Sequence, residues 1–217
     1  MGHDEHDHQP DRDGMDAAAW DATYEENAAM WSGRPNAQLV AEVDGLSPGS
    51  ALDIGCGEGA DAVWLAQRGW TVTAVDISEV ALDRARGRAA EAEVEVTFEQ
   101  RDVVTDPPSP ATYDLVSAQF FHLPDPPRNS ALRGLGEAVA AGGTLLVVGH
   151  QPGTHGGPGH ADRLFAPQEI TALFSPADWE VIVAETRSRR AVHHGEMTDL
   201  VDAVAVLRRL GTLESTT

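Results

Sequence analysis

Residues 52–59 read Leu-Asp-Ile-Gly-Cys-Gly-Glu-Gly, and this stretch decides the fold. The run over residues 51–54 predicts a buried strand, and residues 60–68 predict a helix that Gly69 ends. Glycines at such a strand-to-helix turn permit a backbone path that side chains would block, and they let a ligand approach closely. The stretch therefore predicts a ligand-binding turn at the edge of an α/β sheet.

The rest of the chain continues the alternation of short apolar runs and helical stretches. Further strands are predicted over residues 71–75, 94–100, 112–118, 144–148, 180–185 and 199–207, and helices over 78–92, 130–141 and 167–174. The last two strands must be antiparallel to each other, because a parallel pair needs a longer crossover. We expect an α/β fold with a doubly wound, mostly parallel seven-stranded sheet and a terminal antiparallel strand.

The N-terminal part differs from this pattern. Residues 1–16 hold five Asp, one Glu and one Arg, for a net charge of −5, and three histidines that could catch a metal. They predict a disordered acidic tail, because almost nothing in them can be buried. Residues 17–217 are expected to form a single domain. Its helical N-terminal cap, residues 17–49, is expected to break around residues 32–35, since Pro35 disfavours helix at the residue before it.

Composition excludes several classes of protein. Across 217 residues, Lys and Arg total 15 and Asp and Glu total 35, giving a net charge of −20. Such a surface repels phosphate, so neither nucleic acid nor an anionic membrane is an expected partner. The single cysteine, Cys56, excludes an intrachain disulfide and a cysteine-built zinc site. With no membrane-length apolar run and no signal-peptide pattern, we expect a cytoplasmic protein.

The glycine turn leaves two nucleotide-binding interpretations open. Gly55, Gly57 and Ala60 satisfy the dinucleotide pattern G-x-G-x-x-G/A, so a nicotinamide-dependent dehydrogenase is one of them. Asp53 argues against it, because a carboxylate two residues before the first glycine suits a cationic ligand better than a pyrophosphate. No second nucleotide-binding half follows, and the terminal hairpin does not belong to the dehydrogenase fold.

With this turn and the acids after two further strands, the chain resembles the class I S-adenosylmethionine-dependent methyltransferases of small-molecule type, over roughly residues 20–210. The resemblance implies that residues 53–59 wrap the methionine part and sulfonium of S-adenosylmethionine, which leaves as S-adenosylhomocysteine. It implies that Asp76 accepts the ribose hydroxyls, Ile77 packs on adenine and Asp102 takes the adenine amino group. The other expected cofactor-binding residues are Gly55, Cys56, Gly57, Gly59, Val103, Gln119, Tyr24 and Trp31.

The N-terminal aromatic residues carry a looser resemblance. The pattern W-D-x-x-Y at residues 20–24, the Trp31-Ser-Gly that follows, and residues 162–165 are similar to the tellurite-resistance and thiopurine methyltransferase-like group. We expect Trp20, Tyr24 and Trp31 to close over cofactor and acceptor, with Asn36 as a further substrate-binding candidate. Packing in the core is the alternative role for these aromatic side chains.

Two histidines are candidates for a catalytic base, because each follows a strand at the expected ligand edge. His150 follows the fifth strand and His122 the fourth. The connection over residues 188–197 is expected to be a loop above the acceptor pocket, able to orient a polar acceptor or hold a divalent ion. Its candidate substrate residues are Arg190, His193 and His194.

The sequence thus predicts an enzyme that transfers a methyl group to a small-molecule acceptor. A sulfonium is already an activated leaving group, so the protein mainly has to align the acceptor and exclude water. A hydroxyl acceptor, such as a sugar, also needs a base, which favours O-methylation with a histidine. A thiol or chalcogen S-methyltransferase and a catalytically inactive S-adenosylmethionine-binding regulatory protein remain alternatives. The sequence is compatible with a homodimer but does not specify one.

Overall fold

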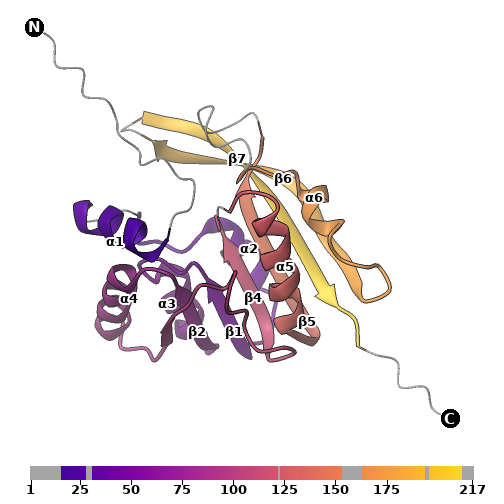
Figure 1. The fold of residues 1–217 in the computed structure, drawn as a ribbon, viewed down its shortest axis with the longest axis horizontal. Helices are drawn as coiled ribbons and strands as arrows, with labels where there is room; N and C mark the ends of the chain where they lie inside the picture. The colour runs from indigo at the N-terminus through magenta and orange to yellow at the C-terminus, as the bar shows by residue number, and fades with distance from the viewer. Residues whose placement is uncertain (1–15, 28–30, 122, 153–162, 194–195, 212–217) are drawn as a thin grey trace, which may run out of the picture.

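The computed structural model describes residues 16–27, 31–121, 123–152, 163–193 and 196–211. Their centre is a seven-stranded sheet with the order β3-β2-β1-β4-β5-β7-β6 (Figure 1). The strands are β1 (Ser50–Ile54), β2 (Thr71–Asp76), β3 (Thr97–Gln100), β4 (Tyr113–Gln119), β5 (Val139–His150), β6 (Trp179–His193) and β7 (Glu196–Arg209). The predicted acidic tail lies outside the described residues, apart from Asp16.

The first five strands are mutually parallel, and β7 runs antiparallel between β5 and β6. The predicted fold class is therefore confirmed. The helices are α1 (Ala17–Glu26), α2 (Ala37–Val43), α3 (Ala60–Gln67), α4 (Glu79–Glu91), α5 (Pro127–Ala138) and α6 (Pro167–Thr171). The N-terminal segment holds two helices, α1 and α2, and residues 32–35 lie between them.

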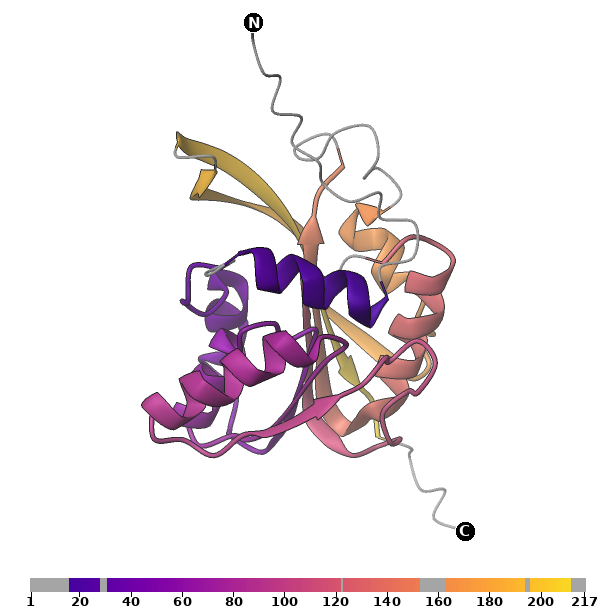
Figure 2. The same ribbon diagram turned by 60° about the vertical axis from the view of Figure 1, so that its left-hand side comes forward.

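Each face of the sheet has its own hydrophobic cluster. On one face, Leu39 of α2 and Leu65 of α3 pack with strand residues such as Leu146. On the other, Leu135 of α5 and Ile170 of α6 pack with the alternate strand residues. Figure 2 shows these two helical layers on opposite sides of the sheet, with α1 lying across its upper end. The central strands are buried on both sides, which explains their nearly continuous apolar sequence.

Hydrogen bonds attach α1 to the start of α4. The Asp21 carboxylate accepts from Ser78 Oγ at 2.6 Å and from the Val80 backbone N–H at 3.2 Å. Arg84 of α4 donates to the backbone oxygens of Tyr24 and Asn27, at the C-terminal end of α1. Because the middle and the C-terminal end of α1 are both bound in this way, the helix is held over the carboxyl edge of β1 and β2.

Several predicted boundaries are wrong. The fifth helix ends at Ala138 rather than residue 141, because Val139 pairs with Tyr113 and starts β5. Strand β3 begins at Thr97 rather than residue 94. The predicted loop over residues 188–197 mostly belongs to β6 and β7, whose pairing continues to His193 and Glu196. These polar residues form strands because each strand satisfies the backbone groups of the other. The hairpin projects beyond the sheet (Figure 1).

A substitution at Gly59 tests how tightly the glycine turn packs against α4. Its φ is +78°, and an added Cβ would lie 2.8 Å from the Ala85 Cβ of α4. We expect Gly59→Ala to lower the free energy of unfolding by about 2–4 kcal/mol, from backbone strain and overpacking together. Gly87→Ala is the control, because no atom lies within 4 Å of its added Cβ. It should stabilise α4 by about 0.5–1 kcal/mol. Urea unfolding measures both values, and equal effects would contradict the packing.

Candidate active site

A row of polar side chains crosses the carboxyl edge of the sheet on one face. Alternate residues of each strand share a face, and on the α2–α3 face the apolar run of each strand gives way to a polar residue. From β2 to β7, the row consists of Asp76, Asp53, Ser117 with Gln119, His150 and Asp202. Five adjacent strands thus present polar groups where open α/β sheets bind ligands.

The glycine turn folds around the Asp76 carboxylate. Its Oδ2 accepts from the Gly57 backbone N–H at 2.8 Å, and its Oδ1 accepts from the Ser78 N–H at 2.9 Å. Gly55, Gly57 and Gly59 have φ values of +63°, +51° and +78°, which only glycine adopts without strain. Burial raises the pKa of Asp76, and its backbone hydrogen bonds only partly offset this effect. Each carboxylate oxygen keeps acceptor capacity for a ligand hydroxyl.

Two further carboxyl groups are buried beside the turn. Asp53 is 2% exposed, and its Oδ2 accepts no hydrogen bond from any described residue. Burial raises the pKa of Asp53 well above its usual range, and the nearby carboxylates of Asp61 and Asp76 raise it further. Burial also raises the pKa of Asp61. A buried carboxylate with one oxygen unpartnered by the described residues, next to two other carboxyl groups, fits a ligand that brings positive charge.

Asp53 should therefore destabilise the protein in the absence of ligand. The pKa of Asp53 is raised in the folded state, so the folded state holds this proton more tightly than the unfolded state does. The contribution of Asp53 to stability is therefore most favourable below the unfolded-state pKa of about 4, and it is lost as the pH rises through the folded-state pKa. We expect Asp53→Asn to raise the free energy of unfolding at pH 7.5 by about 1–3 kcal/mol, with a smaller gain near pH 4. Urea unfolding of the ligand-free proteins at both pH values tests this. A gain independent of pH, or a loss at pH 7.5, would contradict it.

Two of the predicted aromatic residues lie over the glycine turn. The Trp31 Nε1 donates to the Tyr24 hydroxyl at 3.1 Å, and a Cβ on Gly57 would lie 2.9 Å from that hydroxyl. Tyr24 is buried, whereas Trp31 is 54% exposed. The Trp20 ring packs 6.1 Å from that of Tyr24. Tyr24 therefore belongs to the packing of the turn, while Trp31 lies beside it with about half of its surface exposed.

Asn36 lies near the same turn, and its polar N–H groups donate hydrogen bonds to Asp61. Its backbone N–H and its side-chain Nδ2 both donate to the Asp61 carboxylate, each at 2.7 Å. These bonds anchor the start of α2 to α3. The Asn36 side chain therefore keeps its amide oxygen as the group for a substrate contact.

The expected adenine-binding residues lie beside Asp76. The Arg101 backbone N–H donates to the Asp76 carbonyl at 2.9 Å, which brings the end of β3 to the end of β2. The next residue, Asp102, accepts from the Val104 N–H and the Thr105 Oγ1, both at 3.0 Å. Ile77 is half-buried at this edge. Val103 instead packs in the cluster on the opposite face, so only its backbone is available to a ligand.

Gln119 and Cys56 lie near the centre of the edge. The Gln119 amide donates to Ser117 Oγ at 3.1 Å, and its Oε1 is buried without a hydrogen bond from the described part of the chain. The Cys56 backbone N–H donates to the Val75 carbonyl, and burial raises the pKa of its thiol. Cys56 therefore lines the turn as an uncharged thiol, and Gln119 Oε1 is an acceptor that no described residue uses.

His150 and Asp202 form the far end of the row. They are direct partners across β5 and β7, and His150 Nδ1 lies 3.9 Å from Asp202 Oδ1. The centroids of the Phe120 ring and the imidazole are 4.7 Å apart. The Arg189 guanidinium carbon lies 5.2 Å from the Phe120 centroid. Phe120 has a φ of +54°, a strained value for a residue with a side chain. The strained backbone after β4 thus places an aromatic ring against the candidate base.

The remaining predicted residues are only partly described. His122 and His194 lie outside the described residues. Arg190 and His193 belong to β6, and their positions in the hairpin are known for the backbone alone. The hairpin projects past the carboxyl edge (Figures 1 and 2).

Four site residues were missed from the sequence: Asp61, Asp202, Gln38 and Phe120. Asp202 had a detectable signal, because the uninterrupted apolar positions 203–207 directly follow this aspartate. A charged residue next to a buried apolar run is worth examining as part of a site. The other three depend on contacts between distant segments.

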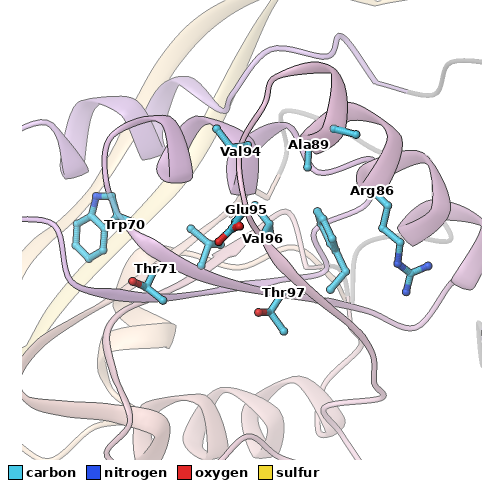
Figure 3. Close-up of a pocket in the computed structure, with 11 residues that line it drawn as sticks. Trp70, Thr71, Arg86, Ala89, Val94, Glu95, Val96 and Thr97 are labelled. Carbon is cyan, nitrogen blue, oxygen red and sulfur yellow. The ribbon is translucent and has the colours of Figure 1, made fainter.

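A separate groove of about 570 Å³ lies at the opposite end of the sheet, between α4 and the amino-terminal ends of β2 and β3 (Figure 3). Trp70, Thr71 and Thr97 are among its lining residues. It contains none of the polar row. The described side chains also bring together no three His, Cys, Asp or Glu that could hold a metal ion. None of the helices in the described ranges has the length and apolar character of a membrane span.

Comparison with known proteins finds similarity to methyltransferases. The family model for a methyltransferase domain matches residues 51–143. A ubiquinone biosynthesis O-methyltransferase of Alkalilimnicola ehrlichii is 36% identical over 149 residues, covering 65% of this chain and 58% of that protein. A 2-heptyl-1-hydroxyquinolin-4(1H)-one methyltransferase of Mycobacteroides abscessus is 31% identical over 123 residues, covering 54% of each. The chain thus spans about half the length of the curated relatives it matches.

A solved structure agrees over nearly the whole chain. The structure described as "Conversion of a Disulfide Bond into a Thioacetal Group during Echinomycin Biosynthesis" has a TM-score of 0.75 and 22% identity, covering 92% of this chain and 94% of that one. At this identity the match shows the fold alone. The finer resemblance to the tellurite-resistance and thiopurine group is not confirmed. The methyltransferase-domain model thus matches residues 51–143, and the fold of nearly the whole chain agrees with that of the solved structure.

Proposed function

We propose that the chain is an S-adenosylmethionine-dependent enzyme that methylates a small molecule on a hydroxyl oxygen, with His150 as the base. The polar row carries this proposal. Its β2 and β1 end holds buried carboxylates around a glycine turn, and its β5 end holds an imidazole on the same face. A nucleoside site and a base that lie along one edge suit a transfer between two bound molecules.

The residues at the β2 and β1 end of the polar row, here called the cofactor half, fit S-adenosylmethionine by charge and by hydrogen bonding. Asp76 can accept both ribose hydroxyls, and Asp102 can accept from the adenine amino group. Asp53 Oδ2, which is buried without a hydrogen bond from the described residues, faces a site whose ligand would bring an ammonium and a sulfonium. When bound, the cofactor supplies a methyl group on an activated leaving group. The exposed Trp31 ring would cover it and exclude water.

The β5 end of the row, here called the acceptor half, suits a hydroxyl acceptor better than a thiol. A hydroxyl stays protonated at neutral pH, so its attack on a methyl carbon is helped by a nearby base. His150 provides one, and the buried Gln119 Oε1 provides an acceptor between it and the cofactor half. The names of two relatives support this choice, because one is an O-methyltransferase and the other is named for a hydroxylated ring.

A turnover assay with matched acceptors tests the proposal. The purified protein is incubated with S-adenosylmethionine and either phenol, catechol, glucose or thiophenol, and S-adenosylhomocysteine is quantified by chromatography. We expect product with at least one hydroxyl acceptor above the rate without acceptor. Product with thiophenol alone would instead establish an S-methyltransferase. Tight binding of S-adenosylhomocysteine without turnover of any acceptor would favour a non-catalytic binding protein.

A further inference from the structure

We infer that Asp202 is a positioning residue that orients His150 and sets which of its ring nitrogens takes the proton. This inference rests on the proposed function, because it deepens the role of the same base. Asp202 is completely buried in the middle of β7, opposite the end of β5. A buried carboxylate is costly unless it is paired, so its surroundings show what it pairs with.

One oxygen of Asp202 is held in place by two other segments. Its Oδ2 accepts from Arg189 Nε of β6 at 2.7 Å and from Gln38 Nε2 of α2 at 3.2 Å. Gln38 is itself held, because its Oε1 accepts from Arg187 at 3.3 Å. Two elements, β6 and α2, thus hold this carboxylate oxygen in place.

The other oxygen is directed to His150. Asp202 Oδ1 is buried and accepts no hydrogen bond from any described residue, and His150 Nδ1 lies 3.9 Å from it. The two residues are also cross-strand partners, which places their side chains on the same face. A small rotation of the imidazole would bring an Nδ1–H within hydrogen-bond distance of Oδ1.

The charges around this pair favour a proton on the ring. Arg187 of β6 is paired with Glu42 of α2 and Glu185 of β6, and Arg189 of β6 shares Asp202 with His150. Asp202 thus places a carboxylate oxygen 3.9 Å from the imidazole.

The chemical consequence is a fixed tautomer. With Nδ1–H directed to Asp202, Nε2 carries the lone pair and is the atom that can act as base. The acceptor oxygen gives its proton to Nε2 as it bonds to the methyl carbon, and the electron pair of the broken carbon–sulfur bond stays on sulfur. The imidazolium that results is stabilised by Asp202.

Nuclear magnetic resonance of the ¹⁵N-histidine-labelled full chain tests this assignment without any turnover. The chain has nine histidines, and a His150→Gln variant identifies the signals of His150. We expect neutral His150 to carry its proton on Nδ1. A proton on Nε2 would overturn the inference, and this result needs no variant of Asp202. If methyl transfer is never observed, the tautomer is still decided.

The titration of His150 provides the second readout. In Asp202→Asn, loss of the facing charge should lower the midpoint of the His150 titration by about one pH unit or more. Glu185→Gln removes the same charge from an exposed position on the neighbouring strand and should leave the midpoint unchanged. A midpoint that Asp202→Asn does not lower, or that both variants lower equally, would overturn the role of Asp202.

Discussion

Replacing His150 by alanine is expected to lower kcat for the best hydroxyl acceptor by about 10²–10⁴-fold, the usual contribution of a general base. The reason is that the acceptor oxygen would keep its proton during attack. Because His150 lies on β5 and Asp76 and Asp53 lie on β2 and β1, the affinity for S-adenosylhomocysteine should change little. Steady-state kinetics and calorimetric titration of the same preparation measure the two quantities.

Two comparisons show that such a loss reflects proton transfer. His150→Gln keeps a polar side chain but takes up no proton near neutral pH, so it should be as slow as His150→Ala. Thiophenol, which ionises far more readily than phenol, should lose much less of any rate it has. A His150→Ala protein that methylates its hydroxyl acceptor at the wild-type rate would remove His150 from the mechanism.

Replacing Asp76 by alanine is expected to weaken S-adenosylhomocysteine binding by about 100-fold or more. Each hydrogen bond from a ligand hydroxyl to a carboxylate contributes about 1.5–3 kcal/mol, and two such bonds would be lost. The Gly57 and Ser78 backbone N–H groups would also lose their acceptor, which would loosen the glycine turn. Isothermal titration calorimetry measures the change directly.

Asp83→Ala is the matched control for Asp76→Ala. Asp83 is an exposed acid of α4 that pairs with Arg86, so its loss removes the same charge without touching the turn. Its effect on affinity should be less than about twofold. If both variants bind equally well, Asp76 does not contact the ribose.

The cofactor half of the site could be predicted because its signals are local. Gly55, Gly57 and Gly59 fall on a strand-to-helix turn where positive φ is required, and Asp76 ends the next strand along the chain. Parallel strands with helical crossovers bring successive carboxyl ends to one edge. The pattern of short apolar runs was therefore sufficient to place these residues together.

The acceptor half could not be predicted in the same way. Gln38 and Asp202 are 164 positions apart, and they meet only because β7 inserts between β5 and β6 while α2 packs on the same face. The strand nature of residues 188–193 was also hidden, because polar residues in a projecting hairpin lack the apolar alternation of a half-buried strand. Long-range pairing, rather than local preference, decided both features.

The central claim is that the glycine turn and the buried carboxylates of Asp53 and Asp76 form a binding site for an S-adenosyl nucleoside. Calorimetric titration of the wild-type protein with S-adenosylhomocysteine, and separately with NAD, tests it most directly. We expect one S-adenosylhomocysteine to bind per chain and NAD to give no heat of binding. Binding of NAD without binding of S-adenosylhomocysteine would contradict the claim.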